Sequence, residues 1–157
     1  MFDIYRKIIS ELENFQFVFT LYEHESVATS IQAAQVRNTP LEWGAKSIIM
    51  YADGKPIMVV VPGNTKIDTK ALKQFINAKD LRMATSAEVL QVTSLPIGAV
   101  PPFGHYFSIP LYMDTEIQRN AQVVFNAGLR NKSIKMKEMD YEKMSKPIRG
   151  KFSRPIS

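Results

Sequence analysis

The sequence has no cysteine and only two histidines, His24 and His105. A disulfide framework, a thiolate metal site and a cysteine nucleophile are therefore excluded, and two histidines are too few for the usual zinc sites. The carboxylates are scattered without the spacing of a paired acid and base, and no G-x-S-x-G elbow occurs. The segment 63–66 lacks the leading glycine of a phosphate-binding Walker loop. The sequence thus predicts neither a metal or cofactor nor a side-chain triad.

Long hydrophobic runs are also missing. The most apolar stretch, residues 57–61, is far too short to cross a bilayer. The first residues show no basic segment followed by an apolar one, so no signal peptide is expected. Together with the lack of cysteine, these features predict a cytoplasmic protein with no membrane partner.

What the sequence does contain is typical of one globular domain. It has 157 residues, of which 45% are hydrophobic and 22% charged. The net charge of +5 fits either a polyanionic partner such as a nucleic acid or an ordinary soluble surface. Much of the positive charge follows Lys132, so we expect a domain over 1–144 and a frayed basic tail over 145–157.

Periodicity and capping residues predict a mixture of short helices and strands. Helices are expected near 2–12, 29–39, 68–76, 85–92 and 137–144. Strands are expected at 15–22, 46–51, 57–61, 81–84, 106–113, 122–125 and 133–136, with a hairpin turn at Asp53-Gly54. Local strand pairing mixed with helices predicts an α+β domain with a mixed sheet.

A loop rich in glycine and proline over 94–105 is the first candidate site. Its core is Gly98-Ala99-Val100-Pro101-Pro102-Phe103-Gly104. Proline fixes φ and removes a donor, whereas glycine lets the backbone approach a ligand. The remaining N–H groups, such as those of Ala99 and Val100, can then point at one acceptor, as oxyanion stabilisation requires. Taken alone, however, the loop is better explained as a rigid connector.

Lys46 is the second candidate. It opens an apolar strand after Trp43-Gly44-Ala45, where an ammonium group can face a cleft and bind phosphate or ribose. Taken alone, it is better explained as an ordinary lysine at a strand end.

These residues belong to four segments that occur together in a known order. The segments are His24–Thr29, Gly44–Ile49, Gly98–His105 and Asn126–Gly128, with Leu81–Val89 preceding the loop. In this combination the chain resembles the YbaK/EbsC-type family, which includes the editing domain associated with prolyl-tRNA synthetases. The resemblance covers about residues 15 to 144. It implies a mostly antiparallel, partly open and barrel-like sheet surrounded by short helices.

The resemblance implies a trans-editing aminoacyl-tRNA deacylase. Such an enzyme hydrolyses the ester between tRNA, most often tRNA(Pro), and a wrongly attached alanine, cysteine, serine or threonine. The family's essential lysine falls on Lys46 and its G-x-x-x-P loop on Gly98 and Pro102. Lys46 is then expected to position the terminal adenosine, while the backbone of Gly98, Ala99 and Val100 holds the ester carbonyl. Water or a substrate group is the nucleophile, and no cofactor is needed.

Further residues are expected to contact the substrate. They are Thr29, Ile31, Ala34, Ser47, Pro101, Pro102, Phe103, Gly104, His105, Asn126 and Gly128. Among them Ile31, Ala34 and Ser47 are candidate walls of an amino-acid pocket, although apolar residues on a short helix also suit a plain core. His105 suits substrate contact or local hydrogen bonding equally, and His24 is expected to be structural.

The expected partners are mischarged tRNA and an aminoacyl-tRNA synthetase, without DNA. Two alternatives remain open at this point. One is a non-catalytic module that binds a tRNA end or a nucleotide and docks onto a synthetase. The other is a small-molecule ester hydrolase that is indifferent to tRNA.

Overall fold

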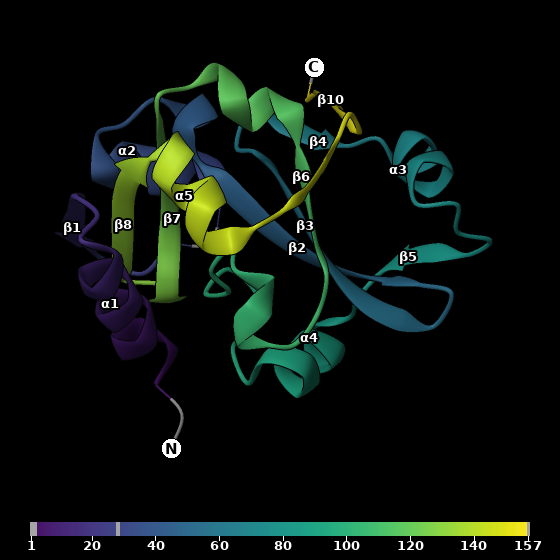
Figure 1. The fold of residues 1–157 in the computed structure, drawn as a ribbon, viewed down its shortest axis with the longest axis horizontal. Helices are drawn as coiled ribbons and strands as arrows, with labels where there is room; N and C mark the ends of the chain where they lie inside the picture. Colours follow the sequence, from purple (N-terminus) through teal and green to yellow (C-terminus); the bar gives the residue numbers. More distant parts are fainter. Residues whose placement is uncertain (1–2, 28, 157) are drawn as a thin grey trace.

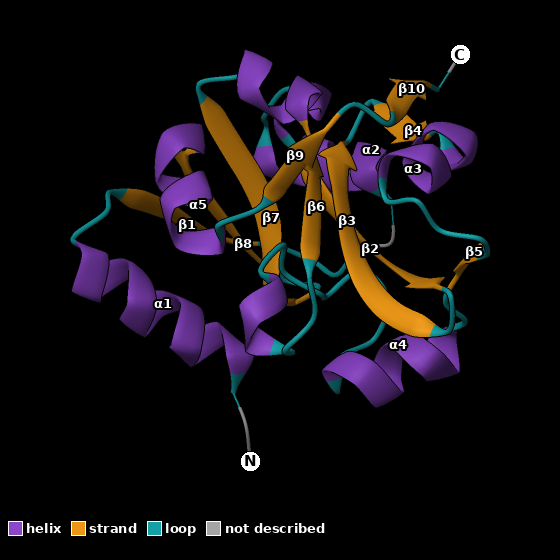
Figure 2. Cartoon of the chain, turned by 45° about the vertical axis from the view of Figure 1, so that its right-hand side comes forward, coloured by secondary structure: helices purple, strands orange, loops and turns teal. Residues whose placement is uncertain are grey.

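The computed structural model describes residues 3–27 and 29–156, and it is an α+β domain (Figures 1 and 2). Its helices are α1 (Ile4–Phe15), α2 (Ser30–Arg37), α3 (Thr69–Phe75), α4 (Ser86–Thr93) and α5 (Glu138–Ser145), with 3-10 turns η1 (Leu41–Trp43), η2 (Gly104–Tyr106) and η3 (Thr115–Arg119). Its strands are β1 (Phe19–Glu23), β2 (Ala45–Ala52), β3 (Lys55–Pro62), β4 (Thr65–Ile67), β5 (Leu81–Met83), β6 (Leu111–Asp114), β7 (Gln122–Leu129), β8 (Lys132–Lys137), β9 (Ile148–Gly150) and β10 (Ser153–Pro155). The predicted fold class is confirmed.

Three sheets build the domain. The largest has the strand order β5-β2-β3-β6-β9, with β6 parallel to β3 and β9 parallel to β6. The second has the antiparallel order β1-β8-β7, and β10 pairs with β4 in a third. A parallel bridge between Gly44 and Val124 joins the start of β2 to β7 without closing the sheets into a barrel. The two larger sheets therefore meet beside the predicted lysine segment.

Local sequence signals explain most of these elements. Asp53 and Gly54 adopt φ values of 49° and 80° between β2 and β3, as the tight primed turns of hairpins require. Thr85 and Glu88 form both hydrogen bonds of a capping box at the start of α4. Thr29 accepts a hydrogen bond from the Gln32 amide at the start of α2. The helix-start and hairpin predictions are thus confirmed. Phe2, in the first predicted helix, and Ala28, in the segment His24–Thr29, lie outside the described residues.

The strand expected over 15–22 begins later than predicted. The first helix continues to Phe15, and Gln16 then turns the chain with φ 60° and donates its N–H to carbonyls of the last helical turn. The rings of Phe15 and Phe17 stack 4.7 Å apart instead of sharing the face of a strand. The alternating aromatic residues imitate a strand pattern, but the left-handed residue between them separates the two elements.

The strand expected over 106–113 is likewise shorter. Gly104 O accepts the amides of Phe107 and Ile109, which holds the first part in the turn η2. Only β6, from Leu111, extends as a strand. A sequence of apolar residues cannot show that two amides converge on one carbonyl.

The expectation of a frayed tail over 145–157 is wrong for the described part of that segment. Strand β9 pairs with β6, and β10 pairs with β4. Phe152 is 1% exposed, and its amide donates to the fully buried Asp114 Oδ2 at 2.6 Å. Exposed basic residues alternate with these contacts, so the sequence of this segment shows no strand pattern. Ser157 lies outside the described residues.

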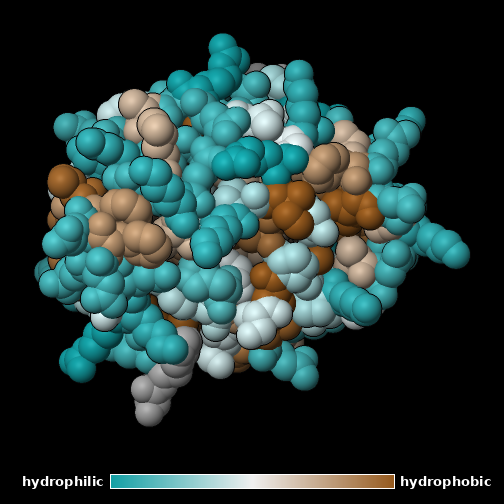
Figure 3. Space-filling view, viewed as in Figure 1, coloured by the Kyte–Doolittle hydropathy of each residue, from teal (hydrophilic) through white to brown (hydrophobic). Residues whose placement is uncertain are grey.

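The outer surface agrees with a globular fold. Figure 3 shows a largely hydrophilic face with hydrophobic side chains gathered right of its centre, in the region of the central strands. Within residues 3–27 and 29–156, no helix combines the length and apolar character needed to cross a membrane.

Candidate functional site

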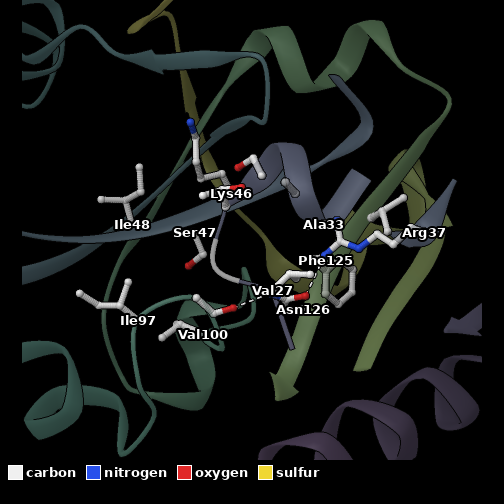
Figure 4. Close-up of a pocket in the computed structure, with 15 residues that line it drawn as sticks. Val27, Ala33, Arg37, Lys46, Ser47, Ile48, Ile97, Val100, Phe125 and Asn126 are labelled. Atoms are coloured by element: carbon white, nitrogen blue, oxygen red, sulfur yellow. Dashed lines mark hydrogen bonds between the residues drawn. The ribbon is translucent and has the colours of Figure 1, made fainter. Parts of the chain in front are cut away.

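A cavity of about 210 Å³ lies where the two larger sheets meet (Figure 4). Its walls come from the segment before α2, from α2, from the start of β2, from the 97–100 part of the loop and from β7. The structure brings together here six of the predicted site residues: Thr29, Lys46, Ser47, Gly98, Val100 and Asn126. Segments that are far apart in the sequence thus meet in one pocket.

Two predicted pocket walls lie elsewhere. The face of α2 that borders the cavity carries Ala33 and Arg37, which are four residues apart. Ile31 and Ala34 instead line a separate hollow with Leu41, and Ile31 is 57% exposed. The helical period therefore turns both predicted walls away from this cavity.

The second half of the loop is buried scaffold rather than cavity wall. Pro101, Pro102, Phe103 and Gly104 are all buried. The Phe103 ring packs edge-on against the rings of Phe125 and Tyr141, each at 5.3 Å. This half of the loop therefore holds the core together.

Close backbone packing and hydrogen bonding fix the ends of this scaffold. The Tyr141 hydroxyl donates to Pro102 O at 2.8 Å. A Cβ on Gly104 would lie 2.5 Å from Ile109 O, so only glycine fits there. His105 is exposed, with Nε2 3.0 Å from Glu11 Oε1. The structure thus places His105 outside the cavity.

Gly128 also lies away from the cavity. It has φ +87° at an irregularity of β7, and a Cβ there would lie 3.2 Å from the Ile4 side chain. This glycine therefore permits α1 to pack closely on the strand.

Lys46 reaches along one side of the cavity, on the opposite side from Arg37 in Figure 4. Its Nζ donates to Thr65 O at 2.6 Å, and no carboxylate of the described residues forms an ion pair with it. Partial burial removes water from the ammonium group and lowers the pKa of Lys46. A half-buried cation without a carboxylate partner favours an anionic or strongly polar ligand.

Arg37 is a second cation in the cavity, and the sequence analysis missed it. It is 7% exposed, and it donates from Nη2 to Asn126 Oδ1 at 2.8 Å and from Nε to Ser133 Oγ at 2.9 Å. Ser133 Oγ in turn donates to Asn126 Oδ1 at 3.1 Å and lies 2.7 Å from His24 Nε2. Desolvation lowers the pKa of Arg37 to about 10. An arginine at a helix end suggests a solvated charge, so the sequence carried no signal for this network.

The backbone around Gly98 is held by side chains from β7 and the turn that follows it. Asn126 Nδ2 donates to Gly98 O. Ile97 O accepts from Arg130 Nε at 2.8 Å and from Arg130 Nη2. The Ala99 amide, expected to hold an oxyanion, instead donates to Pro96 O at 3.1 Å. Among the described residues, no acceptor is found for the amides of Gly98 and Val100.

Within the described part of the chain, no three side chains of histidine, aspartate or glutamate gather closely enough to hold a metal ion. The expectation that the chemistry needs no metal or cofactor remains a prediction.

The sequence model of the aminoacyl-tRNA editing domain matches residues 24–144, a span that contains every residue lining the cavity. The chain belongs to the aminoacyl-tRNA editing domain family. The resemblance found in the sequence is thereby confirmed, and the cavity lies within the span that the family model matches.

Relatives of this editing domain extend over most of its length. It is 26% identical over 155 residues to the multifunctional Ser/Thr-tRNA deacylase ProXp-y of Escherichia coli (strain K12), covering 96% of this chain and 93% of that protein. It is 34% identical over 121 residues to protein YwhH of Bacillus subtilis (strain 168), covering 76% of each. It also matches 15% of the proline–tRNA ligase of Desulfovibrio desulfuricans, at 29% identity over 90 residues.

The fold of the editing domain is shared with solved structures. A structure described as a candidate trans-editing enzyme for prolyl tRNA synthetase superposes with a TM-score of 0.84 at 21% identity, covering 98% of this chain and 99% of that one. The hypothetical protein APE2540 superposes with a TM-score of 0.85 at 19% identity, covering 94% and 99%.

Proposed function

We propose that this editing domain hydrolyses the ester between a wrongly attached small amino acid and the 3′-terminal adenosine of a tRNA. The observation that carries the proposal is the meeting of Lys46 and the Gly98 backbone in one cavity. The Ser/Thr-tRNA deacylase named among the relatives supports serine and threonine as the amino acids, with alanine and cysteine as further candidates. The match to a proline–tRNA ligase supports tRNA(Pro) as the tRNA and a synthetase as a partner, and a cytoplasmic location is part of the same proposal.

The residues of the cavity suit such a reaction without a side-chain nucleophile. Lys46 contacts the phosphate or ribose of the terminal adenosine and so orients the ester. An amide of the Gly98 loop donates to the ester carbonyl, whose oxygen becomes negative as water or a substrate group attacks. The bond between the acyl carbon and the ribose oxygen then breaks, the ribose oxygen takes up the proton that the nucleophile loses, and the tRNA leaves with a free hydroxyl. Lys46 and Arg37, neither of which forms an ion pair with a carboxylate of the described residues, help the cavity to attract the tRNA end.

A second, smaller hollow adjoins the Gly98 backbone and suits the amino-acid side chain. It measures about 90 Å³, and its walls are Ser47, Ile48, Ile49, Met83, Ala84, Val89, Ile97, Gly98 and Val100. Gly98 borders both hollows, so an ester at Gly98 can extend its adenosine into one and its side chain into the other. The small volume excludes larger amino acids by steric conflict.

Enlarging the wall of this hollow tests the assignment. Ala84→Val is expected to lower kcat/KM for threonyl-tRNA by about tenfold and for seryl-tRNA by less, because threonine carries one more methyl group. The measurement is deacylation of both substrates under identical conditions. Ala87→Val on the exposed side of α4 is the matched control and should change neither value. An equal loss for both substrates would show that the side chain lies elsewhere.

A deacylation panel tests the proposed function itself. Purified protein is incubated with alanyl-, cysteinyl-, seryl- and threonyl-tRNA(Pro), and we expect release of at least one amino acid above the uncatalysed rate. Binding of tRNA with an ordinary salt dependence but without release would instead indicate a non-catalytic module. Equal turnover of a small amino-acid ester without tRNA would indicate a tRNA-independent hydrolase.

A further inference from the structure

We propose that Arg130 is a positioning residue that aims the Gly98 amide at the ester carbonyl. The proposal rests on the deacylase function proposed above. It assigns a role to an exposed arginine in the turn between β7 and β8 that lies outside the lining of the cavity.

The peptide unit between Ile97 and Gly98 links the contact of Arg130 to the Gly98 amide. A peptide unit is planar, and in its trans form the C=O and N–H bonds point in opposite directions. No cis peptide bond occurs among the described residues. Arg130 holds Ile97 O through Nε, at 2.8 Å, and through Nη2. Anchoring this carbonyl therefore fixes the direction of the Gly98 N–H, which points away from the guanidinium group.

The next peptide unit is held on both of its sides. Gly98 O accepts from Asn126 Nδ2, and the Ala99 amide donates to Pro96 O. This unit therefore cannot turn its own N–H toward the cavity without breaking two hydrogen bonds. Of the two amides that flank the Gly98 Cα, only the Gly98 N–H has no acceptor among the described residues. The geometry thus selects the Gly98 amide rather than the Ala99 amide as the carbonyl donor.

The conformation of Gly98 is compatible with the same contact. Its φ is +90°, a backbone conformation that residues other than glycine rarely adopt. A Cβ at this position would lie 3.3 Å from Arg130 Nε. Glycine therefore permits both the unusual backbone and the close approach of the guanidinium group.

The charge on Arg130 adds an electronic effect. A hydrogen bond from a charged donor to Ile97 O polarises the whole peptide unit, because hydrogen bonds in a chain strengthen one another. The N–H of Gly98 belongs to that unit and becomes a stronger donor. Arg130 therefore both directs and strengthens the proposed donor without touching the substrate.

An exposed arginine near a tRNA site also has a simpler possible role, which is to contact a tRNA phosphate. The two roles differ in kinetics. A positioning residue acts on the transition state and lowers kcat, whereas a phosphate contact strengthens binding and changes KM and the salt dependence.

Kinetics of Arg130→Ala on mischarged tRNA therefore test the proposal. We expect kcat to fall by about tenfold or more while KM stays within about twofold, since loss of a complete oxyanion donor costs about 100-fold or more. Free guanidinium ion should restore part of the rate. Arg119→Ala is the matched control, because Arg119 is an exposed arginine whose partner is Glu116. It should leave both kcat and KM unchanged.

The amide resonance of Gly98 gives a readout that does not require activity. In Arg130→Ala its chemical shift should move, whereas in Arg119→Ala it should not. Arg130→Lys retains the charge but cannot donate to Ile97 O from two nitrogens of one planar group. It should therefore give a chemical shift and a rate between those of the wild type and Arg130→Ala. If Arg130→Ala does not fold, the rate and the Gly98 chemical shift of Arg130→Lys test the proposal.

Three results would overturn the proposal. One is an unchanged kcat, another is a raised KM with a reduced salt slope at constant kcat, and the third is an unmoved Gly98 resonance. Failure of the wild-type protein to release any amino acid would contradict the proposed function instead. The shift of the Gly98 resonance would still report whether Arg130 controls that amide.

Discussion

Lys46→Ala is expected to lower the rate of deacylation by about 100-fold or more, because a substrate that is poorly oriented loses much of the benefit of binding. The side chain is half-buried, its Nζ donates to Thr65 O at 2.6 Å, and it forms no ion pair with a described carboxylate. Removing it takes away the cation at one side of the cavity and leaves the backbone in place. The measurement is single-turnover release of the amino acid, with circular dichroism to verify folding.

Lys66→Ala is the matched control for this substitution. Lys66 lies on β4 next to Thr65, it is exposed, and it does not line the cavity. Its loss should change deacylation by less than about twofold, because a surface charge outside the site contributes little. Lys46→Ala with full activity would remove this lysine from the proposed mechanism.

The pH dependence gives a second test of the Lys46 ammonium group. Burial lowers its pKa, so the group loses its charge at a lower pH than an exposed lysine does. After subtraction of uncatalysed hydrolysis, activity should therefore fall as the pH rises through that lowered pKa. In Lys46→Arg the charge persists, and any remaining activity should lack this alkaline fall.

Much of the fold could be predicted because its signals are local. The caps at Thr29 and Thr85 and the turn at Asp53-Gly54 each depend on residues within three positions of one another. The tail could not be predicted in the same way. Strand β10 pairs with β4, and Phe152 binds Asp114, which is 38 positions away. Such contacts are decided by the completed fold and leave no periodic pattern in a short basic segment.

The candidate site shows the same difference between local signals, which can be predicted, and long-range contacts, which cannot. Lys46, Gly98 and Asn126 were predicted from the family resemblance, and the structure gathers them in one cavity. Arg37 was missed because its partners, Asn126 and Ser133, lie 89 and 96 positions away. Arg130 was missed because it contacts Ile97 O, a backbone atom 33 positions away that no residue pattern marks. Residues whose partners lie far along the chain are thus harder to predict than residues that belong to a local sequence motif.

Part of the loop over 94–105 belongs to the hydrophobic core. Phe103→Ala is expected to show that this part contributes to stability and not to catalysis. Phe103 is fully buried, with its ring against Phe125 and Tyr141. Truncating a buried phenylalanine to alanine lowers the free energy of unfolding by about 3–5 kcal/mol, since apolar contacts are lost and a cavity is left. Urea unfolding followed by fluorescence or circular dichroism measures the change.

His105→Ala, two residues further along, is the matched comparison. Its ring is exposed and its Nε2 contact with Glu11 is an exposed pair, so we expect a change within about 0.5 kcal/mol. If Phe103 instead lay against the substrate, its truncation would lower kcat/KM while leaving the unfolding midpoint unchanged. A large loss of stability would limit the catalytic part of the loop to the stretch around Gly98, where the backbone is held by Asn126 and Arg130. The buried half would then act by keeping that stretch fixed against the core.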